Sequence, residues 1–256
     1  MKYDLEFDII SKASPAPGFA VLRLRRADRL PLPPVAPGQF VEVEVPDSRH
    51  TFLRRPISVN FVEPDGMTLW LLVRDAGEGT HHLCNLEVGR QIRLMLPLGN
   101  GFGVESRRRT LLVGGGVGVA PLLYLARLMD EAGNRPDVLL GARSAELLLQ
   151  IPEFNKYATV LTATDDGSAG HHGVVTTHPA MTSGEYDLVC CCGPAPMMKA
   201  VAAVARARGI ECMVSLENMM ACGLGACLCC VENTVKGHVC VCTEGPVFNI
   251  NQLNWQ

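Results

Sequence analysis

Residues 110–121 read Thr-Leu-Leu-Val-Gly-Gly-Gly-Val-Gly-Val-Ala-Pro, and an apolar stretch from Leu122 to Met129 follows. This order predicts a strand, a tight turn and a helix. Glycines let the backbone approach a pyrophosphate closely, and the first turn of a helix supplies unpaired N–H groups. The strict G-x-G-x-x-G spacing is not met, because Val119 occupies the third glycine position. A tight turn without a ligand is the alternative, but the position ahead of a helix favours a nucleotide.

The sequence downstream of this turn alternates apolar runs with helical segments. Arg107-Arg-Arg109, just before the turn, is expected to be a solvated linker. Strands that alternate with helices predict a parallel sheet with helices on its faces. We therefore expect an α/β domain over residues 107–210. Its further strands are expected near residues 138–140, 160–162 and 186–191, and its last helix at about 197–208.

The sequence upstream of the turn has a different character. Phe40-Val-Glu-Val-Glu-Val45 alternates apolar and acidic residues at period two, and short apolar runs occupy residues 69–73 and 91–96. Residues 31–37 are rich in proline, which cannot sit inside a sheet. Several short strands separated by turns predict a small antiparallel β-barrel over residues 1–106.

The last segment, residues 211–256, contains a cysteine motif. Cys222, Cys227 and Cys230 follow the spacing C-x4-C-x2-C, and Cys242 comes after eleven further residues. This is the plant-type spacing of a 2Fe–2S cluster. The glycines inside the first gap allow a short loop to turn its N–H groups toward the cluster sulfurs. The motif therefore predicts a small cluster module and one-electron chemistry.

Other uses of the cysteines fit less well. Structural zinc prefers two C-x2-C pairs, and only Cys227 and Cys230 form one here. Disulfides are typical of small secreted domains. Cys229 and Cys240 each stand close to an assigned ligand and remain alternatives to it. The run Cys190-Cys-Cys192 lies in an apolar stretch, and at least its first two cysteines are expected in a buried strand.

The composition excludes several classes of protein. Of 256 residues, 48% are hydrophobic and 19% charged, so a buried core is expected rather than disorder. The net charge of −3 gives no reason to expect nucleic acid or an acidic membrane surface as a partner. No apolar run reaches the roughly 18–20 residues that span a bilayer. Eleven cysteines without an export signal indicate a cytoplasmic location.

The motifs together resemble those of the ferredoxin–NADP reductase superfamily, which joins an FAD-binding barrel to an NAD(P)-binding α/β domain. The cluster module, with Met220-Ala-Cys-Gly-Leu-Gly-Ala-Cys227 and Glu244-Gly-Pro-Val-Phe248, is similar to one branch, the electron transfer subunits of dihydroorotate dehydrogenase B. The resemblance covers nearly the whole chain. Its other motifs are Arg55-Pro-Ile-Ser58, Gly79-Thr80, Leu98-Gly-Asn-Gly-Phe102, residues 114–121 and Cys192-Gly-Pro-Ala-Pro-Met197.

The resemblance implies a role for each motif. The NAD pyrophosphate would lie on Gly114, Gly115, Gly116 and Gly118. Cys192 would be the catalytic residue, and Gly193 would lie with it near the nicotinamide and the flavin ring. The four cysteines of the motif would ligate the cluster. The residues implied for FAD are Arg55, Pro56, Ile57, Ser58, Leu72, Val73, Arg74, Gly79 and Thr80. The motif Arg-Pro-Ile-Ser departs from the Arg-x-Tyr-Ser of the superfamily, so an aromatic residue that would stack on the flavin is missing.

Asp165 bears on the choice of nucleotide. It follows an expected strand in Ala163-Thr-Asp-Asp-Gly-Ser168. An acidic residue there could accept hydrogen bonds from an adenosine ribose and would repel a 2′-phosphate, so NADH is expected over NADPH. A turn without a ligand is the alternative reading. Arg143 is the nearby residue that would favour NADPH.

The resemblance implies an oxidoreductase subunit of pyrimidine biosynthesis without a dihydroorotate site of its own. A partner subunit with FMN would oxidise dihydroorotate, and electrons would pass through the 2Fe–2S cluster and FAD to NAD+. The expected assembly is a heterotetramer with two copies of each subunit. One alternative is a subunit of another NAD(P)H oxidoreductase, of the ferredoxin:NADP oxidoreductase, sulfide dehydrogenase or hydrogenase type. In the first of these an aspartate can replace the first cysteine, so four cysteines lean against it. A non-catalytic redox-sensing module is the other alternative.

Overall fold

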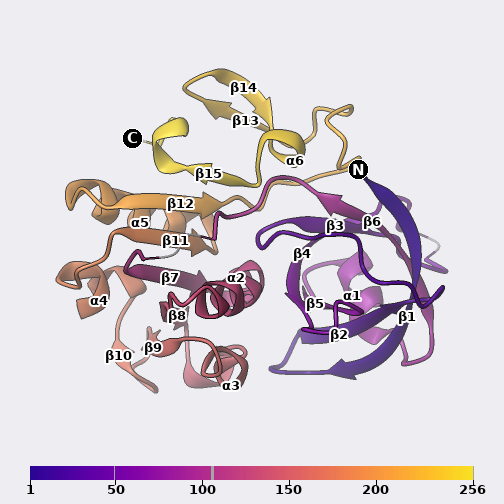
Figure 1. Ribbon diagram of the computed structural model, residues 1–256, viewed down its shortest axis with the longest axis horizontal. Helices are drawn as coiled ribbons and strands as arrows, with labels where there is room; N and C mark the ends of the chain where they lie inside the picture. The colour runs from indigo at the N-terminus through magenta and orange to yellow at the C-terminus, as the bar shows by residue number, and fades with distance from the viewer. Residues whose placement is uncertain (49, 105–106, 256) are drawn as a thin grey trace.

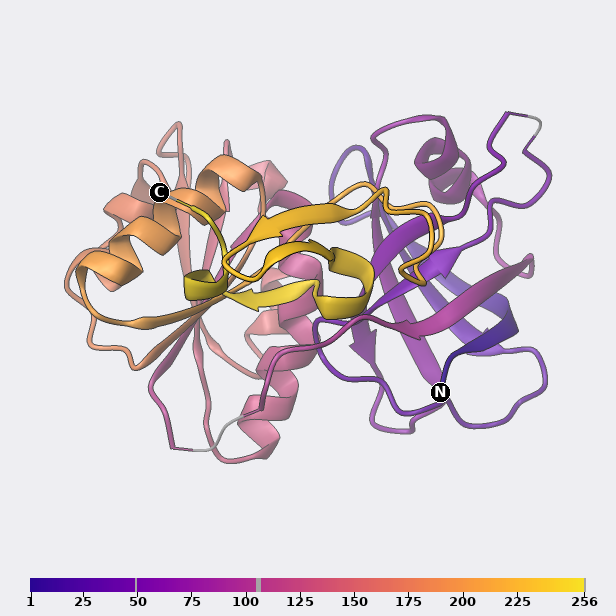
Figure 2. The same cartoon turned by 90° about the horizontal axis from the view of Figure 1, so that it is seen from above.

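The computed structural model describes residues 1–48, 50–104 and 107–255. A β-barrel and an α/β domain lie side by side, and the C-terminal segment crosses the junction between them (Figures 1 and 2). Residues 105 and 106, which end the first expected domain, lie outside the described residues. In the described part of the chain, no helix is long and apolar enough to cross a membrane.

The first body is the expected antiparallel barrel. Six strands close in the order β1-β2-β5-β4-β3-β6, and all neighbours are antiparallel. Inward-facing residues such as Phe7, Leu22 and Leu71 fill the interior, as in other small barrels. The elements are β1 (Tyr3–Ala13), β2 (Phe19–Arg26), β3 (Phe40–Val43), β4 (Arg55–Val62), β5 (Thr68–Arg74), α1 (Glu78–Asn85) and β6 (Gln91–Leu98).

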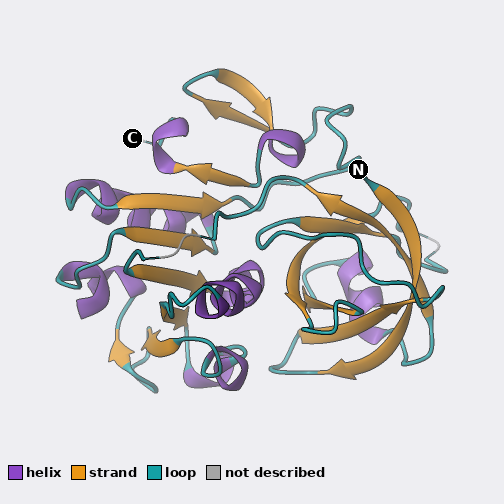
Figure 3. Ribbon diagram, viewed as in Figure 1, coloured by secondary structure: helices purple, strands orange, loops and turns teal. Residues whose placement is uncertain are grey.

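The second body is a sheet in the order β10-β9-β8-β7-β11-β12-β15, as the labels of Figure 1 show. Figure 3 shows its strands in orange and the helices beside them in purple. Its strands are parallel except for β15, which runs antiparallel to β12. The strands are β7 (Thr110–Gly115), β8 (Asp137–Ala142), β9 (Thr159–Thr164), β10 (His171–His172), β11 (Leu188–Cys192), β12 (Glu211–Ser215) and β15 (Val247–Asn249). The helices are η1 (Gly116–Val119), α2 (Ala120–Glu131), η2 (Ala145–Leu147), α3 (Ile151–Phe154), η3 (Val175–Thr177), α4 (Pro179–Thr182) and α5 (Ala195–Ala207).

Helices α2 and α5 cover opposite faces of this sheet. Leu112 packs with α2 residues in one core, which continues into the barrel, whereas Leu111 and Val113 pack with α5 residues in another. Neighbouring strand residues point to opposite faces, so this division follows from the β7 sequence itself. Helix α2 therefore lies between the sheet and the barrel, as Figure 1 shows.

The C-terminal segment packs on both bodies. Its elements are β13 (Val231–Thr234), β14 (Gly237–Cys240), α6 (Val241–Glu244), β15 and η4 (Ile250–Gln252). Asn100, from the barrel motif at 98–102, donates hydrogen bonds to the carbonyls of Thr243 and Glu244 at 2.9 and 3.0 Å. Two motifs more than 140 residues apart in the sequence thus meet at one contact.

The expected start of the cluster module, residue 211, falls on a strand of the parallel sheet. Residues 211–215 form β12, which pairs with β11 along its whole length and belongs to the parallel sheet. Because a central strand cannot be separated from its sheet without breaking its hydrogen bonds, we propose the second domain boundary after Ser215. The three-part division otherwise stays as proposed from the sequence.

Candidate redox site

The barrel places Arg55 against the first turn of α1. An ideal Cβ on Gly79 would lie 2.5 Å from Arg55 Nε, so the Arg55 side chain would have to shift if this residue were not glycine. The Arg55 guanidinium donates to the carbonyl of Arg54 at 3.2 Å, and other donor positions remain available. A guanidinium beside the N-terminus of a helix is an arrangement that fits a phosphate. Thr80 lies in the same turn, where its hydroxyl accepts from the N–H groups of Ala76 and Gly77.

The other residues implied for the flavin differ in how they are exposed. Pro56 and Ser58 are half-buried on β4, and Ile57 is buried. On β5, Leu72 and Val73 are buried and Arg74 is exposed. Because neighbouring strand residues point to opposite faces of the sheet, Leu72 and Val73 are buried on different sides of β5.

The glycine turn after β7 packs against the turn that follows β11. Gly114 and Gly115 end β7, and Gly116 turns the chain with φ of 56°. An ideal Cβ on Gly118 would lie 2.5 Å from the Cα of Gly193, which follows β11. The two turns meet because β7 and β11 are neighbouring parallel strands whose carboxyl ends lie at the same edge. This narrow backbone cradle ahead of α2 fits a pyrophosphate.

We expect Gly118→Ala to lower kcat/KM for NADH-driven dye reduction at least tenfold, or about 1.4 kcal/mol. The added methyl group would strike the backbone of Cys192 and Gly193, which cannot rotate away as a side chain can. FAD and iron content should stay unchanged. Gly209→Ala is the control, because it adds backbone strain in the same domain but meets no atom within 4 Å. Equal losses in both variants would contradict a specific role for this turn.

Cys192 lies beside an acidic residue that the sequence did not indicate. Its thiol is buried and points at Glu217 Oε1, 3.8 Å away. Burial, followed by the charge of Glu217, raises the pKa of Cys192 well above its ordinary value, so the thiol stays protonated. Glu217 has exposed surface, yet desolvation still raises the pKa of its carboxyl group. Glu217 follows β12 at the carboxyl edge of the sheet, where ligands of α/β domains bind. Its place just after a strand could have indicated this residue from the sequence.

Asp165 lies at the same edge, two strands away from the glycine turn. It is exposed after β9, and its N–H donates to the carbonyl of Ala142 at 3.1 Å. The neighbouring Asp166 instead binds the backbone and hydroxyl of Ser168, which lowers the pKa of Asp166. Asp166 therefore shapes its own turn. The role of Asp165 toward a ribose stays a prediction.

Several backbone groups of the cluster loop point at cysteine sulfurs. The N–H groups of Leu224 and Gly225 donate to Cys222 Sγ at 3.3 Å and to Cys242 Sγ at 3.1 Å. The N–H of Cys242 donates to Cys230 Sγ at 3.4 Å. Hydrogen bonds of this kind stabilise thiolates and fit the sulfur ligands of an iron–sulfur cluster. In the described residues, however, no three side chains form a closed set of metal ligands.

The cysteines of this loop differ in their surroundings. Backbone N–H donation, first from Leu224, lowers the pKa of Cys222 to about 6, whereas burial raises the pKa of Cys242 to about 12. Cys229 is exposed, and the thiol of Cys240 donates to the carbonyl of Gly225 at 3.9 Å instead of accepting an N–H. These contacts favour Cys242 over Cys240 as the fourth ligand.

Glu42 is a second residue that the sequence did not single out. It lies on β3, fully buried, and neither carboxyl oxygen has a hydrogen-bond partner among the described residues. Burial, then the charge of Cys222, raises its pKa to about 7. An ideal Cβ on Gly223 of the cluster loop would lie 2.9 Å from Glu42 Cγ, and Glu42 is paired with Pro56 across the sheet. The cluster loop is thus within one strand of the flavin motif.

Comparison with known proteins agrees with this geometry. Residues 217–254 match the model of the iron–sulfur cluster binding domain of dihydroorotate dehydrogenase B. The electron transfer subunit of dihydroorotate dehydrogenase B (NAD+) from Shouchella clausii is 40% identical over 225 residues, covering 85% of this chain and 86% of the relative. The chain belongs to the family of dihydroorotate dehydrogenase B electron transfer subunits. The subunit from Caldanaerobacter subterraneus subsp. tengcongensis is also 40% identical, covering 83% and 84%.

Solved structures place the family in a wider fold group. The NADH-dependent reduced ferredoxin-NADP oxidoreductase structure aligns with a TM-score of 0.86 and 31% identity, covering 97% of this chain and 90% of that one. Phthalate dioxygenase reductase, at 23% identity and a TM-score of 0.64 over 79% of this chain and 64% of its own, shares the fold. The expected fold, the expected family and the expectation of an NAD-dependent oxidoreductase subunit with an iron–sulfur domain are confirmed.

Proposed function

We propose that the chain carries electrons between an FMN-containing dihydroorotate dehydrogenase catalytic subunit and NAD+, and that it holds a 2Fe–2S cluster, FAD and NAD. When bound, these groups exchange single electrons on the cluster side and a hydride on the nicotinamide side. The observation that carries the proposal is the contact between the cluster loop and β3. Because neighbouring strands lie about 4.8 Å apart, this contact puts Gly223 close to the flavin motif that begins β4.

The residues of the chain would divide this work. Arg55 and the first turn of α1 would bind the FAD phosphates, and the turn at Gly114–Gly118 would bind the NAD pyrophosphate. Cys192 and Glu217 would flank the place where nicotinamide and flavin meet, and the buried thiol would exclude water there. Cys222, Cys227, Cys230 and Cys242 would ligate the cluster.

Three exposed apolar side chains of the cluster loop, which we call the docking patch, support a docking role. Met219, Leu224 and Leu228 are 81%, 46% and 64% exposed, whereas Met220 is buried and does not contribute to the patch. Exposed apolar groups gathered at one place are typical of protein interfaces. We propose that this patch meets the catalytic subunit in a heterotetramer of two copies of each. The absence of disulfides among the described cysteines supports a cytoplasmic location.

We expect the isolated chain to reduce dyes from NADH but not to oxidise dihydroorotate, and expect the added catalytic subunit to restore NAD+-dependent dihydroorotate oxidation. Leu224→Glu should weaken the complex at least tenfold in Kd, because it buries a charge at the interface, while dye reduction stays unchanged. Val174→Glu is the matched control, since Val174 is a 52% exposed apolar residue of the other domain. Titration calorimetry with the catalytic subunit measures both variants.

Two results would contradict parts of this proposal. Dihydroorotate oxidation by the isolated chain would contradict the division between subunits. Wild-type affinity of the Leu224→Glu variant for the catalytic subunit would contradict the docking patch and leave the rest of the proposal standing.

The likeness to the NADH-dependent ferredoxin-NADP oxidoreductase favours a second candidate, a subunit of such an enzyme. Failure to bind the dihydroorotate catalytic subunit, together with intact NADH-driven dye reduction, would support that candidate.

A further inference from the structure

The barrel and the α/β domain are joined by a buried pair of amide side chains. Asn60 on β4 donates from Nδ2 to Gln150 Oε1 at 2.9 Å, and Gln150 Nε2 donates back to Asn60 Oδ1 at 2.9 Å. Both residues are buried, with exposures of 0% and 5%. Gln150 holds a left-handed backbone conformation with φ of 57°, which is unfavourable for a residue other than glycine. The structure maintains this strain at a contact between residues 90 positions apart.

Asn60 makes a third hydrogen bond, from Nδ2 to the carbonyl of Ala120 at 3.1 Å. Ala120 is the first residue of α2 and follows directly on the glycine turn. Asn60 itself lies two residues after Ser58, the end of the flavin motif. One side chain therefore connects the strand of the flavin motif to the helix that begins at the nucleotide turn.

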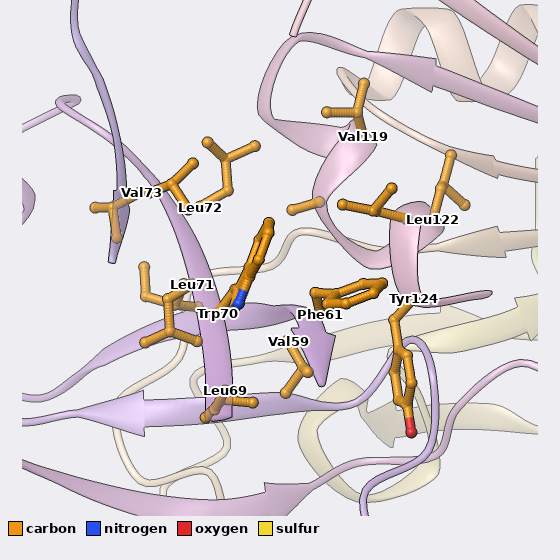
Figure 4. Close-up of a cluster of buried hydrophobic side chains, with 14 of the residues drawn as sticks. Val59, Phe61, Leu69, Trp70, Leu71, Leu72, Val73, Val119, Leu122 and Tyr124 are labelled. Atoms are coloured by element: carbon orange, nitrogen blue, oxygen red, sulfur yellow. The ribbon is translucent and has the colours of Figure 1, made fainter. Parts of the chain in front are cut away.

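The rest of this interface is mostly apolar, with a further directional contact from Arg127. Figure 4 shows Phe61 of β4 beside Tyr124 of α2. The ring centroids of Phe61 and Tyr124 lie 6.2 Å apart, and those of Phe61 and Tyr157 lie 5.8 Å apart. Arg127 donates to the carbonyl of Val62 at the same interface. Apolar contacts are not directional and tolerate small sliding movements, whereas a buried amide loses free energy when its partners shift.

We propose that Asn60 and Gln150 are positioning residues for hydride transfer, because they set the register between the flavin motif and the nucleotide turn. This inference rests on the proposed function. In the proposed direction the reduced flavin would give a hydride, with its two electrons, to NAD+, which would become NADH; reduction of the flavin by NADH would be the same step in reverse. Its rate depends on the distance between the two rings, and a displacement of about 1 Å can cost roughly a hundredfold. The two amides bind each other and the carbonyl of Ala120. They would therefore act on the cofactors through the backbone of β4 and α2.

The test is the double variant Asn60→Leu/Gln150→Leu, studied with bound FAD and cluster. Replacing both partners by apolar groups of similar size avoids an unsatisfied buried amide, so folding should persist. We expect the rate of flavin reduction by NADH in stopped-flow measurements to fall at least tenfold. The Kd for NADH should change less than threefold, and the long-wavelength charge-transfer absorbance between nicotinamide and flavin should weaken. If the two residues had a merely structural role, the rate of flavin reduction would not fall while the Kd for NADH stayed nearly unchanged.

Asn254→Ala is the matched control, because it removes an exposed amide-to-amide hydrogen bond, Asn254 Nδ2 to Asn233 Oδ1 at 3.0 Å, far from this interface in the sequence. A wild-type rate in the folded, FAD-loaded double variant would overturn the inference and leave the proposed function intact. If NADH did not reduce the wild-type flavin, the proposed function itself would fail. If the double variant did not fold, Gln150→Met is the second test, because it breaks the amide pair but leaves Asn60 Nδ2 bound to the carbonyl of Ala120. It should still lower the rate threefold or more, and an unchanged rate would again overturn the inference.

Discussion

Cys230→Ser is expected to remove the 2Fe–2S centre from the chain. Cys230 is buried, and its sulfur accepts the N–H of Cys242, so the loop holds this sulfur in a fixed position. A serine hydroxyl is a poorer ligand for iron than a thiolate. Cys222→Ser, Cys227→Ser and Cys242→Ser should have the same effect. Visible absorbance and iron content per chain measure the outcome, which should approach zero from about two irons per chain.

Two nearby cysteines provide the controls for this series. Cys229→Ser should leave the iron content close to wild type, because Cys229 lies outside the C-x4-C-x2-C spacing of the motif. Cys240→Ser should also retain the cluster, because the Cys240 thiol points at the Gly225 carbonyl instead of accepting an N–H. Loss of iron in Cys240→Ser with retention in Cys242→Ser would show that the fourth ligand is misassigned. Loss of iron in Cys229→Ser with retention in Cys230→Ser would show that the third ligand is misassigned.

Arg55→Ala is expected to release FAD. The substitution removes charge-assisted hydrogen bonds to phosphate, each of about 1.5–3 kcal/mol, so the Kd for FAD should rise roughly 10–100-fold. Iron content should persist, because the cluster cysteines lie in a separate segment of the chain. The measurement is the ratio of flavin to protein after gel filtration, together with the Kd for added FAD.

Arg54→Ala is the matched control for this prediction. Arg54 is the preceding arginine, but its guanidinium forms ion pairs with Asp4 at 2.8 Å and with Glu44 at 3.6 Å. Its loss should affect FAD little, since exposed ion pairs contribute at most about 1 kcal/mol. Equal FAD loss in both variants would point to a general effect of positive charge, and full occupancy in Arg55→Ala would place the phosphate elsewhere.

The amino-acid sequence determined the local parts of this protein. The strand, glycine turn and helix at 110–129 appear as β7, η1 and α2, because period and turn chemistry act over a few residues. The cysteine spacing likewise indicated an iron–sulfur module, which the family comparison confirms. These features are readable because each depends on residues that are close together along the chain.

Only the tertiary structure decided how these parts meet. The sequence did not show that β12 and β15 would extend one sheet, since an apolar strand pattern does not name its partner. Nor did it show that Glu42 would lie under the cluster loop or that Cys192 would face Glu217. Asn60 looked like an ordinary polar residue of a barrel strand. Its role appears only when the fold buries it against Gln150, because a hydrogen bond between residues 90 positions apart depends on the packing of two whole domains.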